Sequence, residues 1–212
     1  MHKQYAVIGM GRFGTSLART LYKLGQEVLA IDTDEERLRY VAEEVTHTLL
    51  ADTTDVNVLK SIGIANFDVV VVSIGEDVQA SIMTTLLLKE LGVPYVVTKA
   101  LNKMQGRVLE KVGADRVVYP ERDMGKRVAH NLVASNLLDY IELSPGFRIC
   151  EVVAQKEMFG KSLKELDWRA KYNINVILIK RSDGEVLFSP VANDSIMMGD
   201  VMVLAGERDG LD

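Results

Sequence analysis

A regular alternation of short apolar runs and helix-forming segments is the feature that most restricts how this chain can fold. The apolar runs are residues 5–9, 27–32, 47–52, 68–75, 95–100 and 116–121. Between them lie segments with helical spacing, acidic starts or glycine ends, at 15–25, 34–44, 54–63 and 79–92. Strands that are apolar throughout and alternate with helices belong to a parallel sheet covered on both faces. The sequence therefore predicts an α/β fold built on a Rossmann-like, doubly wound parallel sheet.

The pattern changes after about residue 140, which indicates a second and smaller domain. A helical pattern over 123–143 closes the first domain, and the turn-forming sequence "SPG" at 144–146 follows it. Beyond this turn the chain has a β-α-β-β-β outline, which predicts an α+β domain too small to be the catalytic half of a dehydrogenase. We place the two domains at residues 1–143 and 147–212.

The turn after the first predicted strand carries the pattern G-x-G-x-x-G, with Gly9, Gly11 and Gly14. In such turns the first glycine allows the tight bend, the second lets the backbone approach a phosphate, and the third lets the helix pack on the strand. The amides at the helix N-terminus then face the phosphates. Asp32 ends the second strand about 20 residues further on, where a carboxylate accepts a ribose hydroxyl. We therefore predict a site for an adenine nucleotide at this turn.

Further carboxylates suggest how the adenosine half is held. Asp34 adds a second acidic group near the ribose, and we place no arginine beside it to receive a 2′-phosphate, which disfavours NADP. Asp52 ends the third strand with Thr53 beside it, where an adenine amino group can donate to the carboxylate. The alternative is that "DTTD" only caps the following helix, because Asp and Thr are favoured at that position.

Three charged residues are candidates for the phosphate end of the ligand. Arg12 lies in the glycine turn, where a guanidinium can clamp a phosphate; the alternative is a solvated surface arginine. Lys99 and Glu121 end the fifth and sixth strands, at the sheet edge where open α/β folds bind ligands. Lys99 can meet a phosphate directly. Glu121 would act through a divalent cation or a hydroxyl, or would only favour the N-terminus of the next helix.

No catalytic group accompanies the predicted nucleotide site. His2, His47 and His130 all lie away from the carboxyl edge of the predicted sheet, so none is placed as the acid and base of a dehydrogenase. The sequence has no G-x-S-x-G, no HExxH and no Cys–His pair. We therefore expect a ligand-responsive regulator and not an enzyme. The alternatives are an NAD-dependent dehydrogenase or reductase, and an interaction module whose nucleotide is structural.

Composition restricts the setting in which the protein works. The formal net charge of −5 argues against a nucleic-acid partner. No apolar run approaches the ~18 residues that span a bilayer, and no signal layout precedes the first strand, so we expect a cytoplasmic protein. Cys150 is the single cysteine, which excludes an internal disulfide and predicts a buried residue on a strand.

Four segments carry a resemblance to a known family: "YAVIGMGRFGTSLARTL", "DVVVVSIGEDVQASIMTTLLLKELG", "KVGADRVVYPERDMGKRVA" and "RAKYNINVILIKR". Together they resemble the RCK (KTN) family, and within it the KtrA/KtrC-type cytosolic regulatory subunits of Ktr potassium uptake systems. The resemblance implies an N-lobe that binds ATP or ADP, with NAD as the other candidate. It also implies dimers that assemble into an octameric ring and gate a potassium-transporting membrane subunit of the KtrB/KtrD type. The protein would then be cytoplasmic and peripheral at the inner face of the cell membrane.

The resemblance also assigns residues of the N-lobe by motif. The residues implied to form the nucleotide site are Gly9, Gly11, Arg12, Phe13 and Gly14 at the phosphates, Asp32 at the ribose, and Glu121 at a site that a cation shares. The long helix after Glu121 is implied to be the crossover element through which such lobes pair.

In the C-lobe the resemblance implies a cyclic di-AMP site at a dimer interface. The residues that match by position are Arg169, Ile174, Asn175 and Pro190. An arginine can pair with a phosphate while apolar side chains sandwich a purine. The alternative for Arg169 is a solvated helix residue. The chain ends in "GERDGLD", so a final helix found in some relatives is expected to be missing or cut away.

Overall fold

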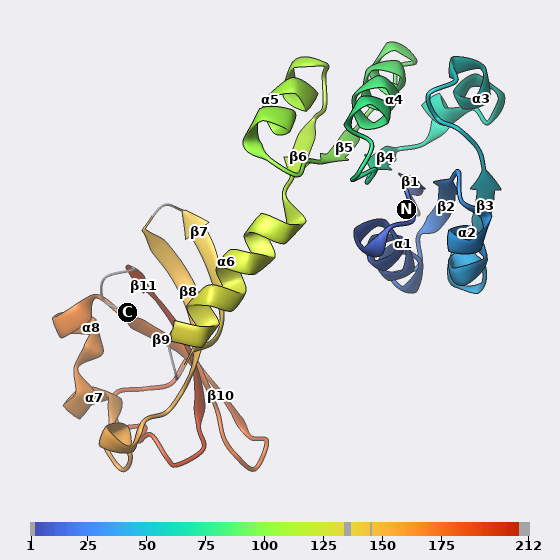
Figure 1. Cartoon of the computed structure of the whole chain (residues 1–212). Coiled ribbons are helices and arrows are strands. Elements are labelled where there is room, and N and C mark those ends of the chain that lie inside the picture. The colour runs from blue at the N-terminus through green and yellow to red at the C-terminus, as the bar shows by residue number, and fades with distance from the viewer. Residues whose placement is uncertain (1–2, 134–136, 145, 208–212) are drawn as a thin grey trace. The chain divides into compact units, whose positions relative to one another are not determined.

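The protein has two compact units, Met1–Arg122 and Asp123–Asp212, in a computed structural model that describes residues 3–133, 137–144 and 146–207. The first unit is an open sheet with helices, and the second contains an antiparallel sheet (Figure 1). No helix within the described ranges is both long and apolar enough to cross a membrane. The domain limits expected from the sequence, 1–143 and 147–212, stay a prediction.

A six-stranded parallel sheet forms the first unit, in the order β3-β2-β1-β4-β5-β6. Its strands are β1 (Gln4–Ile8), β2 (Glu27–Asp32), β3 (His47–Leu50), β4 (Val69–Val72), β5 (Val96–Lys99) and β6 (Arg116–Val118). The predicted α/β fold and its doubly wound sheet are thereby confirmed. Because the strand order reverses between β1 and β4, the connections diverge there and leave a crevice at the carboxyl edge.

Helices cover both faces of this sheet (Figure 1). They are α1 (Arg12–Lys23), α2 (Glu35–Val41), α3 (Val56–Ser61), α4 (Val78–Glu90) and α5 (Lys103–Lys111), with short 3-10 turns at Ala42–Glu44 and Ile64–Asn66. In Figure 1, α1 and α2 lie on one side of the sheet, and α3, α4 and α5 lie on the other. Sequence analysis identified the first four of these helices but did not single out α5.

Alternate residues of β1 divide between two apolar cores, one on each face. Ile8 is buried with Leu59 of α3 and Leu88 of α4, whereas Val7 is buried with Ala18 of α1. Burial of each large aliphatic side chain contributes about 1.5–3 kcal/mol relative to exposure. This two-sided burial explains why the strands of this unit are apolar at nearly every position.

The register of β1 places the glycine turn between the ends of two other strands. Ile8, the last residue of β1, lies level with the penultimate residue of β2 and with the last residue of β4. The next residues along the three chain segments are Gly9 after β1, Asp32 at the end of β2, and Ser73 after β4. These three residues therefore meet at the carboxyl edge of the sheet.

The second unit contains an antiparallel sheet in the order β10-β9-β11-β8-β7. Its strands are β7 (Leu137–Ser144), β8 (Phe147–Val153), β9 (Asn175–Lys180), β10 (Val186–Phe188) and β11 (Val201–Glu207). Two short helices, α7 (Leu163–Leu166) and α8 (Trp168–Tyr172), and a 3-10 turn at Lys156–Met158 connect β8 to β9. Cys150 is buried on β8 in the core of this unit, as predicted.

The segment predicted to be one helix over 123–143 is divided. The helix α6 covers Pro120–Val133, residues 134–136 lie outside the described residues, and Leu137–Ser144 forms β7. From Leu137 onward the helix prediction is wrong, because β7 pairs antiparallel with β8, and Gly146, with φ of +85°, lies in the turn between them. The apolar residues of this segment fit either period, so pairing with β8 decides its structure. The prediction about a final helix concerns the end of the chain, where residues 208–212 also lie outside the described residues.

Candidate functional site

The glycine turn between β1 and α1 is held in a conformation that requires glycine at its first position. Gly9 has φ of +94°, which side-chain-bearing residues rarely adopt, and its amide donates to the carbonyl of Ile31 at 2.8 Å. A Cβ at this position would lie 3.0 Å from the amide nitrogen of Ile74. The turn is therefore fixed tightly between β2 and the segment that follows β4.

The other two glycines of the turn differ in what surrounds them. A Cβ on Gly14 would lie 1.9 Å from the carbonyl oxygen of Gly9 and 2.3 Å from the hydroxyl of Ser73, so α1 can approach the strand only with glycine there. A Cβ on Gly11 would meet no protein atom within 4 Å. Nothing in the fold itself requires glycine at position 11, so the free space is available to a ligand.

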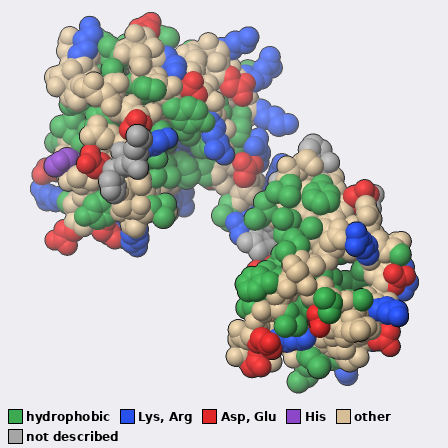
Figure 2. Space-filling model, turned by 180° about the vertical axis from the view of Figure 1, so that it is seen from behind, with side chains coloured by type: hydrophobic (Ala, Val, Ile, Leu, Met, Phe, Trp, Pro, Cys, Tyr) green, Lys and Arg blue, Asp and Glu red, His purple; other side chains and the backbone are tan. Residues whose placement is uncertain are grey.

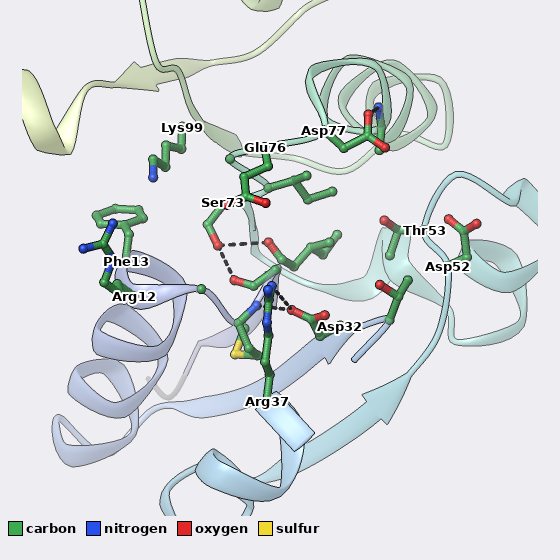
Figure 3. A pocket seen from close by; sticks show the side chains of 18 of the residues that line it. Arg12, Phe13, Asp32, Arg37, Asp52, Thr53, Ser73, Glu76, Asp77 and Lys99 are labelled. Carbon is green, nitrogen blue, oxygen red and sulfur yellow. Dashed lines mark hydrogen bonds and ion pairs between the residues drawn. The ribbon is translucent and has the colours of Figure 1, made fainter. Parts of the chain in front are cut away.

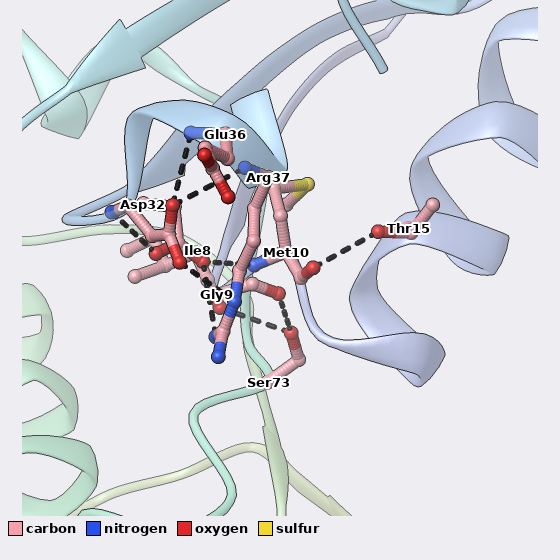
Figure 4. A network of polar contacts seen from close by, with 9 residues as sticks. Ile8, Gly9, Met10, Thr15, Asp32, Glu36, Arg37 and Ser73 are labelled. Atoms are coloured by element: carbon pink, nitrogen blue, oxygen red, sulfur yellow. Dashed lines mark hydrogen bonds and ion pairs between the residues drawn. The ribbon is translucent and has the colours of Figure 1, made fainter. Parts of the chain in front are cut away.

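A network of hydrogen bonds fixes the turn to the neighbouring strand ends (Figure 4). The hydroxyl of Ser73 contacts the carbonyl oxygens of Ile8 at 3.0 Å and Gly9 at 2.5 Å. The amide of Met10 donates to a carboxylate oxygen of Asp32 at 2.5 Å. Side chains that follow β4 and end β2 thus hold the backbone of the turn in place from both sides.

A cavity of about 1000 Å³ opens over this turn at the carboxyl edge of the sheet (Figure 3). This volume is at the upper end of the range for small-molecule sites. The predicted residues that line it are Gly9, Gly11, Arg12, Phe13, Asp32, Asp52, Thr53, Lys99 and Glu121. Gly14 does not line the cavity, since it is buried against Gly9 and Ser73. The structure therefore brings nearly all of the predicted N-lobe residues to one place.

One end of the cavity is cationic. Arg12 and Lys99 stand at this end (Figure 3), and the ammonium of Lys99 donates to the carboxylate of Glu121 at 2.6 Å. The Lys99 side chain is only 11% exposed, whereas that of Glu121 is 60% exposed. The hydrogen bond from Lys99, with a smaller contribution from the charge of Arg12, lowers the pKa of Glu121. This end carries two cations, Arg12 and Lys99, and one carboxylate, Glu121, so its excess positive charge suits phosphate oxygens.

The opposite end carries carboxylates and hydroxyls. Asp52 and Thr53 stand there (Figure 3), and hydrogen bonds from the hydroxyl and then the amide of Thr54 lower the pKa of Asp52. The hydroxyl of Thr53 lies 2.9 Å from that of Thr84 in the buried interior. The cap of α3 is Asp55, whose side chain accepts from the amide of Asn57. Asp52 itself thus lines the cavity and is not the capping residue.

The surroundings of Asp32 differ from the sequence-based expectation in two respects. Asp34 does not line the cavity, because its carboxylate caps α2 by accepting from the amides of Glu36 and Arg37. The expectation that no arginine stands beside this acid is wrong, since Arg37 Nε lies 3.3 Å from Asp34 and its Nη1 lies 3.9 Å from Asp32. The helical turn of α2 folds Arg37 back toward these carboxylates.

The predicted divalent cation would depend on the ligand for most of its coordination. Within the described part of the chain, no three His, Cys, Asp or Glu side chains gather into a metal site. Glu121 is the predicted metal ligand, and its carboxylate is occupied by Lys99. A cation at this place would therefore take further oxygens from bound phosphates, as Mg²⁺ commonly does.

The residues expected to bind cyclic di-AMP lie in the second unit, and their side chains differ in how far they are exposed to solvent. Arg169 of α8 and Asn175 at the start of β9 are exposed, and Pro190 is half-buried. Ile174 is only 6% exposed and belongs to the apolar core of this unit. Among the four, Arg169 and Asn175 have side chains that an incoming ligand can reach directly.

Several lining residues were missed by sequence reasoning. The main omission is the segment after β4, where Ser73, Ile74, Gly75, Glu76 and Asp77 line the cavity. The placement of β4 beside β1 carries this segment to the glycine turn, and the end of a strand adjacent to β1 is the signal that could have identified it. Arg37 was missed because its position depends on how α2 is rotated about its axis.

Comparison with known proteins gives two domain matches, the TrkA-N domain over residues 5–120 and the TrkA-C domain over residues 148–212. The chain belongs to the TrkA-N/TrkA-C, or RCK, family. The Ktr system potassium uptake protein C of Bacillus subtilis (strain 168) is 49% identical over 206 residues, which are 97% of this chain and 93% of that protein. The Ktr system potassium uptake protein A of the same organism is 44% identical over 207 residues, 98% of this chain and 93% of that protein.

Solved structures support the same fold for this RCK protein. A structure titled GsuK Channel aligns with a TM-score of 0.71 at 17% identity and covers 100% of this chain and 38% of that chain. Another, titled GsuK channel bound to NAD, aligns with a TM-score of 0.56 at 23% identity and covers 99% of this chain and 37% of that chain. The resemblance stated from the sequence is confirmed. Family membership makes the chain a KtrA/KtrC-type regulatory subunit and not an enzyme, so the dehydrogenase alternative is wrong.

Proposed function

We propose that this protein is the nucleotide-responsive subunit of a potassium uptake system. It binds ATP or ADP in the cavity of the first unit, and the bound nucleotide determines whether a KtrB/KtrD-type membrane subunit conducts potassium. The single observation that carries the proposal is the cavity around Gly11, with cations at one end and carboxylates and hydroxyls at the other. The names of the relatives, both Ktr system potassium uptake proteins, support the transport setting.

The polarity of the cavity suggests how the nucleotide lies. Phosphates belong with Arg12, Lys99 and the first amides of α1, because the N-cap residue Gly11 has no side chain to accept from them. Adenosine belongs at the opposite end, where Asp52 and Thr53 can accept from the purine amino group and Asp32 from the ribose. In this orientation the terminal phosphate reaches the cationic end, and Glu121 either moves away from it or shares a cation with it.

A ligand can shift a conformational equilibrium only by its difference in affinity for the two states. ATP and ADP differ by the γ-phosphate, so the residue that discriminates them must touch that group. Arg12 is the candidate, because it is exposed at the phosphate end and its planar guanidinium can bind phosphate oxygens with two hydrogen bonds.

The first prediction concerns this discrimination. Arg12→Ala should remove most of the preference between ATP and ADP, about tenfold in Kd, since a charge-assisted contact to phosphate contributes about 1.5–3 kcal/mol. Isothermal titration calorimetry with both nucleotides measures it. Lys23→Ala, at the other end of α1, is the matched control and should change neither affinity. An unchanged ATP-to-ADP ratio in the Arg12 variant would show that this arginine does not read the γ-phosphate.

The transport role requires a separate measurement. Vesicles that contain the membrane subunit and this protein should show different potassium flux with ATP and with ADP, and the difference should disappear with Arg12→Ala. Equal flux under all conditions would favour the remaining alternative, an interaction module whose nucleotide is structural.

The proposal further includes dimers that assemble into an octameric ring at the inner face of the cell membrane, and a cyclic di-AMP site that uses Arg169, Asn175, Ile174 and Pro190.

A further inference from the structure

The adenosine end of the cavity contains a cation that the proposed nucleotide contacts do not use. Arg37 lines the cavity from α2, and its side chain is 53% exposed. Its Nε lies 3.3 Å from Asp34 and its Nη1 lies 3.9 Å from Asp32, which are ion-pair distances. Among the interactions of the described residues, the guanidinium makes no hydrogen bond through its Nη atoms. The planar end of Arg37 therefore has donors available to a ligand.

The two neighbouring carboxylates are already engaged by backbone amides. Asp32 accepts from the amide of Met10 at 2.5 Å and from that of Asp34 at 2.9 Å. Asp34 accepts from the amides of Glu36 at 2.9 Å and Arg37 at 3.4 Å. These four donors offset part of the negative charge around the guanidinium. Asp34 in addition contacts Nε, the guanidinium nitrogen nearest the side-chain methylenes, and so acts as a positioning residue for the two Nη atoms.

The chemistry that such an arrangement recognises follows from where the ribose lies. In a glycine turn of this type, the acid at the end of the second strand accepts the ribose 2′-hydroxyl, whereas a nearby arginine accommodates a 2′-phosphate. Both groups are present here. Because a guanidinium can bind phosphate with two parallel hydrogen bonds, the Nη atoms of Arg37, which make only the 3.9 Å ion pair with Asp32 among the described residues, match that group.

We propose that Arg37 enables the site to accept adenine nucleotides that carry a phosphate on the ribose 2′ oxygen, the class that includes NADP, beside those with a free hydroxyl. This inference rests on the proposed nucleotide site at the glycine turn. The negative charge of Asp32 opposes the 2′-phosphate, so the 2′-phosphorylated form binds more weakly than the form with a free 2′-hydroxyl, by less than about tenfold. The protein is therefore permissive at this position and does not select one form.

The experiment compares two ligands that differ only in the group at issue, ADP and 2′-phospho-ADP, by titration calorimetry on the full chain. Arg37→Gln should weaken 2′-phospho-ADP by about tenfold or more and change ADP by less than about threefold. Asp34→Asn should weaken 2′-phospho-ADP to a smaller degree, since it only loosens the guanidinium. Arg39→Gln is the matched control, because Arg39 of the same helix is 72% exposed, pairs with Glu35 and does not line the cavity.

The outcomes separate this inference from the function on which it rests. If ADP fails to bind the wild-type protein, the proposed nucleotide site itself is wrong, and the role of Arg37 falls with it. If ADP binds but 2′-phospho-ADP binds more than about tenfold more weakly, the site selects the free hydroxyl and the inference is overturned. It is also overturned if Arg37→Gln weakens both ligands equally while the melting temperature is unchanged, because Arg37 then contacts a shared phosphate.

Discussion

Gly11 and Gly14 belong to the same turn, yet they restrict the protein for opposite reasons. Gly14 is required by the protein, since any Cβ there would collide with the carbonyl of Gly9. Gly11 faces open space in the cavity, so under the proposed function the requirement for glycine at this position comes from the ligand. The pair therefore separates residues that maintain the fold from residues that admit a phosphate.

Substitution of the two glycines should show this difference. Gly14→Ala should cost about 3 kcal/mol or more, because α1 must move away from the strand. Gly11→Ala should lower the unfolding free energy by only about 0.5–1 kcal/mol, because alanine is a poorer helix cap. It should weaken the binding of ATP at least tenfold, since the new methyl group enters the phosphate position. Urea unfolding and calorimetry measure the two effects. Equal destabilisation by both substitutions would contradict the assignment.

The ion pair between Lys99 and Glu121 makes a second prediction at this scale. Lys99→Met should weaken ATP by about tenfold, because a nearly buried cation at the phosphate end is lost. Glu121→Gln, measured in the presence of a chelator, should strengthen the binding of ATP by about threefold. The reason is that Lys99 is released and a negative charge beside the negative phosphates is removed. Titration of ATP into each variant tests this. A change in the same direction for both variants would show that the pair serves packing and not phosphate binding.

At the scale of the secondary-structure elements, the carboxylate of Asp115 holds the edge strand β6 of the first sheet to its neighbours. Asp115 precedes β6 and accepts from Lys89 of α4 at 2.8 Å and from the amide of Val96 in β5 at 2.7 Å. Burial alone would raise the pKa of Asp115, but the hydrogen bonds from Lys89 and Val96 outweigh it, and the pKa is lowered. One side chain directly before β6 thus connects this strand to α4 and β5.

This connection should make stability depend on pH with a defined sign. Because the pKa of Asp115 is lower in the folded than in the unfolded chain, its contribution is complete above about pH 4 and is lost as the pH falls through the folded value. Asp115→Asn should therefore reduce the unfolding free energy by about 1–2 kcal/mol at pH 7, and the difference from wild type should shrink toward pH 3. Urea unfolding across this range measures it. A difference that is constant with pH would exclude the carboxylate as its cause.

Elements set by local pattern could be predicted from the sequence, and those set by distant partners could not. The strands of the first sheet and the turn at Gly9 follow from apolar runs and glycine spacing, which are local. The segment Leu137–Ser144 forms β7 because it pairs with β8, and the helical spacing of its residues gave no sign of this. Likewise, Lys99 and Glu121 were placed at one edge, but their hydrogen bond depends on how α6 begins.

The whole molecule is linked by α6, whose first turn carries Glu121 at the cavity and whose remaining residues belong to the second unit. Met124, Val128 and Leu132 recur every four residues on one face of this helix and are 55%, 48% and 80% exposed. Hydrophobic side chains are also exposed on the face of the second unit seen in Figure 2. An apolar helix face exposed to this degree is typical of an interface between protein chains.

We therefore expect the chain to self-associate through α6, as the family resemblance implies. Val128→Glu places a charge in the centre of the apolar face and should convert the assembly to smaller species at micromolar concentration, because burial of an unpaired carboxylate is costly. Lys126→Glu is the matched control, since position 126 lies about 200° around the helix from position 128. Sedimentation equilibrium measures the mass of each. If Val128→Glu keeps the mass of the wild type, or if the wild type is itself monomeric, the apolar face of α6 does not hold the assembly together.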